Sequence, residues 1–237
     1  KKQQEKLLTA ERYSAWESVA RKLAHEIKNP LTPIQLSIDR LREKYLQKVG
    51  PEGEKFNSYL NTINKQIKDI ENLVNEFSDF ARMPKPVLKK IDISNIVFES
   101  LKFYELPESK IKFNFSKTKS NFQLKADEKQ FNRVFVNLIK NSVESVKEKG
   151  SKNVDFKGKI NIDIRDDRDY IYVTITDNGV GFSDVDKSKM LTPYFTTKEK
   201  GTGLGLAIVS KIINDHNGEI LLKSITDGAE VKVKLPI

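Results

Sequence analysis

Large apolar residues recur every three or four positions through the first third of the chain. From Trp16 to Tyr45 the successive spacings are 3, 4, 4, 4, 3, 4, 3 and 4, and from Phe56 to Ala81 they alternate between 4 and 3. Such spacings are typical of heptad seams, so they predict two long helices. The seam residues are Trp16, Val19, Leu23, Ile27, Leu31, Ile34, Ile38, Leu41, Tyr45, Phe56, Leu60, Ile63, Ile67, Ile70, Val74, Phe77 and Ala81.

The stretch KVGPEG separates the two seams and contains two glycines and a proline. It predicts a turn, so the helices should fold back on each other as an antiparallel hairpin. One hairpin cannot enclose seams of this length, whereas two hairpins form a four-helix bundle. We therefore expect a homodimer.

One histidine interrupts the regular pattern of the first helix. The extra spacing of 4 lies across Leu23, Ile27 and Leu31, and such a stutter locally unwinds a coiled coil. His25 lies within it, and at about 100° per residue its side chain should point away from the seam into water. A solvent-facing histidine can be a simple polar filler, so its neighbours decide the interpretation.

Those neighbours favour a chemical role. Pro30 and Pro33 remove the hydrogen bonds to the carbonyls of Glu26 and Asn29, and a proline inside a helix costs about 3 kcal/mol. The segment is therefore expected to bend close to His25. Glu26 can bind one ring nitrogen and fix the tautomer that leaves the other nitrogen nucleophilic.

Beyond the proline-punctuated stretch RMPKPV the apolar period changes. Alternating or continuous apolar runs predict strands in IKFNFS, NFQLKAD, GKINIDIR, YIYVTITD, GEILLKS and AEVKVKLP. Helical patterns cover about 93–105, 128–149 and 203–216, and Asp127 with Gln130 resembles a capping box before the longest of them. This mixture predicts an α/β two-layer sandwich.

The longest predicted helix of this second region carries a polar face. Asn137, Lys140 and Asn141 share it, because residues at i, i+3 and i+4 are neighbours on a helix. Amide oxygens suit Mg²⁺, and Lys140 can neutralise a phosphate oxygen. The alternative is a solvated helix face.

A second cluster follows the strand YIYVTIT. A buried carboxylate at Asp177 can accept a hydrogen bond from the N6 amino group of adenine, whereas guanine would present an oxygen there. Gly179 and Gly181 let the backbone approach a base closely. Taken alone, DxGxG is also a common turn.

The third cluster, GTGLGLAIV, places Gly201, Gly203 and Gly205 at the start of a helix, where bare N–H groups attract phosphates. About twenty residues separate it from DNGVG, which is long for a connection and predicts a mobile lid. Phe195 would anchor this lid, and Lys198 would reach the phosphates.

Composition narrows the possible functions. Lys and Arg number 42 against 33 Asp and Glu, for a net charge of +9, but lysine is scattered among acids, which favours a lysine-rich soluble protein over a nucleic-acid binder. The chain has no cysteine, which excludes disulfides and thiolate metal sites. It has no apolar run of about 18 residues. Because it begins without Met inside a charged helical pattern, we expect a longer protein with membrane or sensory segments upstream.

Five stretches together resemble the sensor histidine kinases. AHEIKNPLTPI is similar to the H box of that family, NLIKNSVES to the N box, DNGVGF to G1, PYFTTK to the F box and GTGLGLAIV to G2, all in the family order. WESVARKLAHEIKNPLTPIQLSIDRLREKY and FSDFARMPKPV resemble most closely the nitrogen-regulation, NtrY-like subgroup.

The resemblance implies the domain organisation. Residues 1–15 would end an upstream signalling helix, 16–83 would form the dimerisation and histidine phosphotransfer domain, 84–90 a linker, and 91–237 a catalytic ATP-binding domain of the Bergerat type. This kinase core would lie in the cytoplasm, with the full-length protein anchored in the bacterial inner membrane. Its partners would be a second copy and the receiver domain of a response regulator, and not nucleic acid.

The resemblance also implies roles for individual residues. His25 would be the phosphoacceptor, Glu26 its base, and Asn29 would position water for dephosphorylating the partner's phosphoaspartate. The cofactors would be ATP and Mg²⁺, with Asn141 as a principal metal ligand. The nucleotide-binding residues would be Asn137, Lys140, Asn141, Asp177, Gly179, Gly181, Phe195, Lys198, Gly201, Thr202, Gly203, Leu204 and Gly205.

Two rival functions remain open. An ATP-gated machine of the same nucleotide fold, such as a mismatch-repair or chaperone-like ATPase, would hydrolyse ATP repeatedly and would not need His25. A dimeric scaffold with a vestigial ATP site would bind a receiver domain but would take no label from ATP.

Overall fold

The computed structural model describes the backbone of the chain outside residues 1, 82, 106–109, 154, 183–186 and 199–200, and the side chains outside 1–21 and 187–188 as well. The chain divides into two compact units, Lys1–Pro84 and Lys85–Ile237, and each is taken by itself below.

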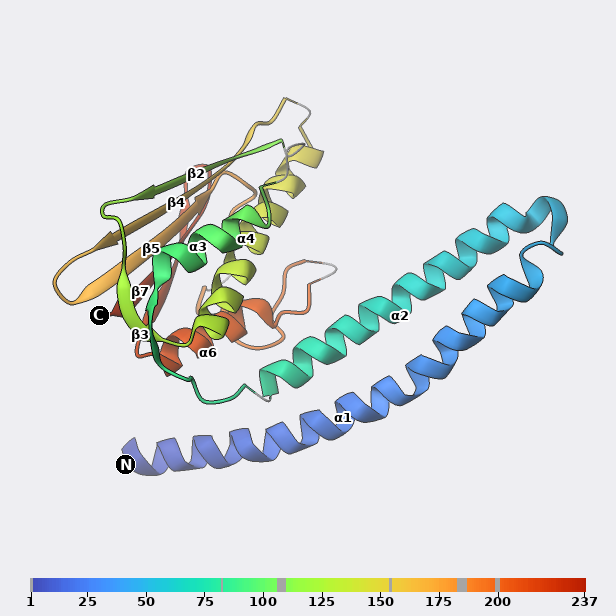
Figure 1. Cartoon of the computed structure of the whole chain (residues 1–237), viewed down its shortest axis with the longest axis horizontal. Coiled ribbons are helices and arrows are strands. Elements are labelled where there is room, and N and C mark those ends of the chain that lie inside the picture. The colour runs from blue at the N-terminus through green and yellow to red at the C-terminus, as the bar shows by residue number, and fades with distance from the viewer. Residues whose placement is uncertain (1, 82, 106–109, 154, 183–186, 199–200) are drawn as a thin grey trace. The chain divides into compact units, whose positions relative to one another are not determined.

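The first unit is a helical hairpin, as the seams predict. Helix α1 (Lys2–Tyr45) and helix α2 (Gly53–Ala81) run antiparallel and are joined through the short helix η1 (Gly50–Glu52) (Figure 1). Gly50 adopts a φ of +59°, a conformation that glycine allows. Helix α1 continues through both prolines and curves gently along its length (Figure 1).

Only some of the predicted seam positions are buried. Leu31, Ile38, Leu60 and Ile67 form the core between the helices, with Phe56 packed against them. Val74 is also buried, and Phe77 and Ala81 are half-buried. Seven other seam residues are between 40% and 44% exposed: Leu23, Ile27, Ile34, Leu41, Tyr45, Ile63 and Ile70. The predicted seam side chains of Trp16 and Val19 lie outside the described part of the chain.

The second unit contains a five-stranded mixed sheet and a two-stranded one. The large sheet has the order β2-β4-β5-β7-β6, in which β2 and β4 are parallel and the other neighbours antiparallel. Strands β1 and β3 pair separately in antiparallel fashion. The strands are β1 (Lys89–Asp92), β2 (Ile111–Lys117), β3 (Gln123–Ala126), β4 (Gly158–Asp166), β5 (Tyr170–Asp177), β6 (Glu219–Ile225) and β7 (Gly228–Pro236).

Helices cover one face of the large sheet. Helices α3 (Ile93–Lys102), α4 (Glu128–Ser151) and α6 (Gly205–Asp215) lie on that face, while α5 (Lys187–Met190) is a single short turn (Figure 1). Side chains of β5 alternate between buried and half-buried, because successive residues of a strand point to opposite faces. This arrangement confirms the predicted two-layer α/β sandwich.

Strand β1 is not among the predicted strands. It begins at Lys89, within the stretch 84–90 that the family resemblance assigns to a linker. Two lysines in a four-residue strand leave no apolar alternation to detect, and the strand forms because β3 pairs with it.

The first turn of α4 is fixed by Asp127. One carboxylate oxygen accepts from the Gln130 N–H at 3.1 Å, which is one half of the predicted capping box, and the other accepts from the Val87 N–H at 2.8 Å. The Asp127 N–H donates to His216 and not to the Gln130 side chain, so the other half does not form. Burial would raise the pKa of Asp127, but these backbone hydrogen bonds hold it below its ordinary value. The buried His216 ring accepts from the Asp127 N–H at 3.1 Å and lies 2.8 Å from the Ile212 carbonyl, which ties α4 to the end of α6.

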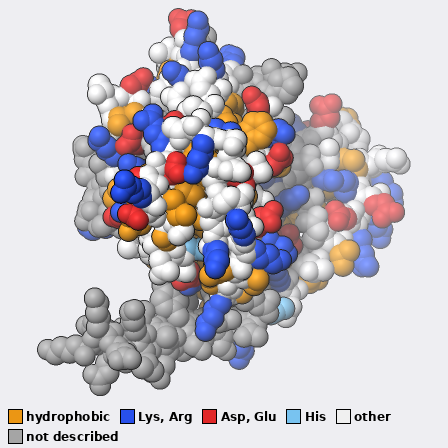
Figure 2. Space-filling model, turned by 60° about the vertical axis from the view of Figure 1, so that its left-hand side comes forward, with side chains coloured by type: hydrophobic (Ala, Val, Ile, Leu, Met, Phe, Trp, Pro, Cys, Tyr) orange, Lys and Arg blue, Asp and Glu red, His pale blue; other side chains and the backbone are white. Residues whose placement is uncertain are grey.

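Charges of both signs are mixed on the surface. On the face shown in Figure 2, lysine and arginine lie among acidic and uncharged side chains, as the sequence pattern suggests. Within the described residues, no helix combines the length and the apolar character needed to cross a membrane.

Candidate functional site

Helix α4 provides the frame of the candidate nucleotide site. Its residues from Asn137 to Lys149 contact, in order, the start of α6, the segment after α5, the end of β5 and the β6–β7 hairpin. The polar clusters that lie far apart in the sequence are therefore brought together along one helix.

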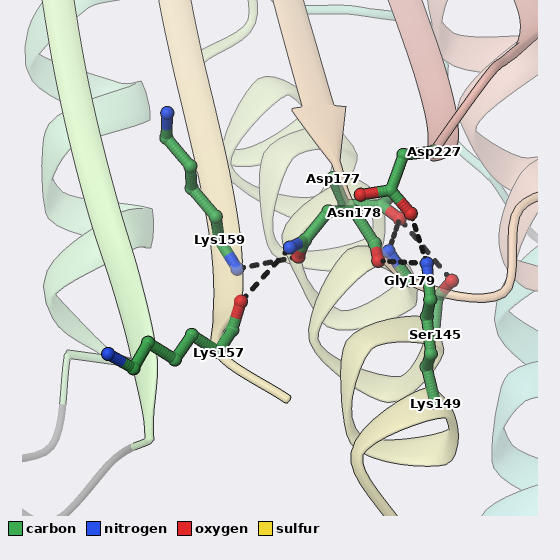
Figure 3. Close-up of polar contacts among 8 residues, drawn as sticks. All are labelled: Ser145, Lys149, Lys157, Lys159, Asp177, Asn178, Gly179 and Asp227. Carbon is green, nitrogen blue, oxygen red and sulfur yellow. Dashed lines mark hydrogen bonds and ion pairs between the residues drawn. The ribbon is translucent and has the colours of Figure 1, made fainter. Parts of the chain in front are cut away.

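The buried carboxylate of Asp177 lies at one end of this frame, at the end of β5. It accepts hydrogen bonds from the Gly179 N–H at 3.0 Å and from the Ser145 hydroxyl at 3.3 Å (Figure 3). The side chain is 4% exposed. A carboxylate so enclosed is a selective acceptor for a donor such as an exocyclic amino group.

Burial raises the pKa of Asp177 above its ordinary value. The hydrogen bonds from Gly179, Ser142 and Ser145, followed by the positive charge of Lys149, act in the opposite direction but do not cancel the cost of desolvation. The fold therefore keeps a carboxylate that it does not fully stabilise.

The glycines around Asp177 are required by close packing. A Cβ on Gly179 would lie 2.2 Å from the Ser145 hydroxyl oxygen. Gly181 has a φ of +73°, and a Cβ there would lie 2.8 Å from the Gly228 carbonyl oxygen. The absence of a side chain at these glycines lets the loop after β5 pack against α4 and the β6–β7 hairpin.

Lys149 joins three elements behind Asp177. Its ammonium group donates to the Asn178 carbonyl at 3.0 Å and forms an ion pair with Asp227 in the β6–β7 hairpin (Figure 3). The Asn178 side chain in turn accepts from the Lys159 N–H at 2.7 Å and donates to the Lys157 carbonyl at 3.0 Å. The loop that carries Asp177 is thus held from both sides.

The glycine cluster GTGLG lies at the other end of the frame. A Cβ on Gly205, the first residue of α6, would be 3.7 Å from the Asn137 amide oxygen. The start of α6 therefore lies close to the polar face of α4. Thr202 accepts from the Leu204 N–H at 3.3 Å, and Leu204 at the N-cap has no side chain that caps α6. Gly203 has a φ of +68°, and its carbonyl accepts from the Tyr194 N–H at 3.0 Å.

The ammonium groups predicted for phosphate contact meet at one carboxylate. Lys198 forms an ion pair with Glu144, and the Lys140 ammonium lies 3.9 Å from the other oxygen of the same side chain. Asn141 is half-buried on this face of α4, and Phe195 is half-buried in the segment before Lys198. Residues 183–186 and 199–200 of the predicted lid lie outside the described residues.

The polar groups at the two ends of α4 are chemically suited to a nucleoside triphosphate and its metal. A buried acceptor lies at one end, while amides, ammonium groups and an uncapped helix start lie at the other. Amide oxygens such as that of Asn141 are hard ligands suited to Mg²⁺.

The candidate phosphoacceptor belongs to the first unit. His25, Glu26 and Asn29 are all exposed on α1, which agrees with the predicted orientation of the histidine. The Glu26 carboxylate lies 3.9 Å from the Lys22 ammonium, one helical turn before it. Both partners of this pair are largely solvent-exposed, so the carboxylate can exchange partners at little cost.

Sequence patterns missed several residues of the site. Ser145 and Lys149 follow Asn141 at i+4 and i+8, so helical spacing carried a signal for them. Glu144 also shares this face. Asp227 lies in a distant hairpin, and nothing in its local sequence indicates that it pairs with Lys149.

Two family models match the chain. Residues 126–237 match the family described as histidine kinase-, DNA gyrase B-, and HSP90-like ATPase, and residues 15–86 match the His Kinase A (phospho-acceptor) domain.

Relatives and solved structures extend the match to the whole chain. Nitrogen regulation protein NtrY of Azorhizobium caulinodans is 38% identical over 98% of this chain, and a putative sensor histidine kinase NtrY-like of Rickettsia conorii is 37% identical over 100%. The chain spans only 30% and 38% of the length of these two proteins. The crystal structure of histidine kinase ThkA in complex with the response regulator protein TrrA has a similar fold, with a TM-score of 0.67 and 24% identity over 99% of this chain and 66% of that one.

Proposed function

The chain belongs to the histidine kinase family, and on that premise we propose that it is an ATP-dependent kinase that phosphorylates its own His25. The observation that carries the proposal is the joint presence of an exposed His25 on a helical hairpin and a two-ended nucleotide frame on α4. Each matches one of the two domains of such an enzyme.

The nucleotide frame would bind and orient ATP. Asp177 would accept from the adenine amino group, while Asn137, Lys140 and Lys198 would contact the phosphates at the other end. Phosphoryl transfer depends mainly on positioning and charge stabilisation, which explains a pocket built from amides, ammonium groups and a helix start. A bound Mg²⁺, for which Asn141 is the candidate ligand, would neutralise phosphate charge.

His25 would act as the nucleophile. The unprotonated ring nitrogen forms a bond to the γ-phosphorus, the bond from that phosphorus to the bridging oxygen breaks, and ADP leaves with the electron pair. The proton on the other ring nitrogen passes to Glu26 after that carboxylate exchanges Lys22 for the ring.

The phosphoryl group would then pass from His25 to an aspartate of a response regulator. A related histidine kinase of the same fold was crystallised with such a partner, which supports this assignment. Asn29 lies on the exposed side of α1 one turn beyond His25, where it can orient water for the opposing activity, hydrolysis of the partner's phosphoaspartate to aspartate and phosphate. The NtrY relatives suggest a signalling role connected with nitrogen.

The hairpin would work as a homodimer. Each helix leaves several seam residues about two-fifths exposed, and a second hairpin would cover them in a four-helix bundle. Membrane attachment of the full-length protein stays a prediction.

The decisive experiment is incubation with γ-labelled ATP and Mg²⁺, comparing the wild type with His25→Gln. We expect an acid-labile, base-stable label on the wild type and none on the variant. Equal labelling of both proteins would contradict the proposal. Repeated ATP hydrolysis that is indifferent to the substitution would indicate the ATP-gated machine, and partner binding without any label would indicate the scaffold.

A further inference from the structure

We propose that Glu144 is an internal counter-ion that competes with the nucleotide's phosphates for Lys198 and Lys140, and so sets the affinity for phosphorylated ligands. This inference rests on the proposed function and deepens it. It gives a role to a side chain that is neither a predicted metal ligand nor a predicted phosphate contact.

The carboxylate of Glu144 is shared between two ammonium groups from different elements. One oxygen pairs with Lys198, in the segment that follows α5, and the other lies 3.9 Å from Lys140, one turn earlier on α4. Within the described part of the phosphate end, these two lysines are the cations predicted to contact phosphates. Each must exchange a carboxylate oxygen for a phosphate oxygen when it binds a nucleotide.

The backbone groups of Lys198 itself are hydrogen-bonded, while its side chain can pivot. The Lys198 N–H donates to the Thr196 hydroxyl at 3.1 Å, and the Gly201 N–H donates to the Lys198 carbonyl at 3.1 Å. A Cβ on Gly201 would lie 2.2 Å from that hydroxyl oxygen, so Gly201 lies close against Thr196. The flexible stem of lysine allows the ammonium group to change partners while these backbone hydrogen bonds stay in place.

The position of Glu144 on α4 places negative charge beside the expected triphosphate. It follows Lys140 by four residues and Asn141 by three, so all three share one helix face. A carboxylate there repels phosphates as well as occupying the lysines. Removing this negative charge should therefore strengthen phosphate binding in two ways, by ending the repulsion and by releasing the lysines.

Solvent limits the size of the effect. The side chains of Glu144 and Lys198 are 42% and 37% exposed, and water screens pairs of this kind. Neutralising Glu144 should strengthen ATP binding about two- to five-fold, the range expected for loss of an exposed ion pair. Adenosine, which has no phosphates, should bind with unchanged affinity.

The test is calorimetric titration of the full chain with ATP, ADP and adenosine, each with Mg²⁺ and with EDTA. Glu144→Gln is compared with the wild type and with Glu148→Gln, a matched control on the same helix. Glu148 pairs with Lys152 at 3.1 Å and is 48% exposed, so its neutralisation removes the same charge away from the site. We expect tighter binding of ATP and ADP for Glu144→Gln only.

Unchanged or weaker ATP binding by Glu144→Gln would overturn the inference, and weakening confined to Mg²⁺ would identify a metal ligand instead. Adenosine binding reports whether the variant is folded at the base end. A double-mutant cycle with Lys198→Met gives a second test, because the gain from Glu144→Gln must shrink when Lys198 is absent. Failure of the wild type to bind any nucleotide would refute the proposed function itself, which is a separate result.

Discussion

Asp177 is a residue that the fold retains at a cost in stability. It is buried without an ammonium group in direct contact among its described partners, and the hydroxyl and amide donors around it only partly replace water. Such a carboxylate is expected where a ligand, and not the fold, needs the acceptor.

Replacing Asp177 with asparagine should therefore stabilise the chain while weakening adenine nucleotide binding. Because burial raises the pKa of Asp177 in the folded chain, its contribution to stability is greatest in acid and is lost as the pH rises through that raised pKa. The asparagine side chain cannot ionise. The free energy of unfolding of Asp177→Asn, relative to that of the wild type, should therefore increase from acid to neutral pH. Urea unfolding at a series of pH values measures this difference.

Asp127→Asn is the matched control with the opposite sign. Hydrogen bonds outweigh burial and hold the pKa of Asp127 below its ordinary value, so its stabilisation is present at neutral pH and is lost in acid. The cost of Asp127→Asn should thus shrink as the pH falls. If both variants showed the same trend with pH, the assignment for Asp177 would be wrong.

At the residue scale, part of the candidate site could be predicted from the sequence. Asp177 and the glycines beside it were found because a strand pattern ends in a turn motif, and Lys149 could have been found from its helical spacing. The Asp227 contact depends on strands β5 and β7 lying side by side, which only the folded sheet determines.

At the scale of elements, α1 combines continuity with weakness. It remains helical through Pro30 and Pro33, yet two carbonyls of the turn after His25 lack their helical donors. The Pro33 carbonyl itself accepts from the Ser37 hydroxyl at 2.8 Å, a bond that is often found where helices bend. A bend at this place would change the direction in which His25 is presented.

Replacing both prolines with alanine should stiffen α1 and change the ratio of autokinase to phosphatase activity. Each substitution restores a backbone donor, and removal of a helix-interior proline favours the straight helix by up to about 3 kcal/mol. The ratio is measured by label gained on His25 and label lost from a phosphorylated partner. An unaltered ratio would mean that bending at these prolines does not select the activity.

Element boundaries were predictable where an apolar period was long. The predicted helix at 128–149 corresponds to α4 at Glu128–Ser151, because a cap and nine buried positions define it. Strand β1 and the parallel pairing of β2 with β4 were not predictable, since both depend on partners distant in sequence.

At the scale of the whole molecule, the exposed half of the seams predicts assembly. Ile70 is 40% exposed and Ile67, one turn before it on α2, is 5% exposed. Ile70→Asp should convert a dimer to monomers while leaving the hairpin helical, because it places a carboxylate where a second hairpin would pack. Ile67→Asp should instead unfold the hairpin. Sedimentation equilibrium and circular dichroism separate these effects, and an Ile70→Asp chain that stays dimeric would contradict the proposed bundle.

Because both ends of the candidate site lie along α4, the helix fixes the distance between them. Asn137, beside the glycine cluster, and Ser145, beside Asp177, are eight residues apart, which a helical rise converts to about 12 Å. The distance between the two ends of the site is therefore set by one continuous helix and not by loops. A ligand must be long enough to reach both ends, and a shorter ligand would be bound at one end only.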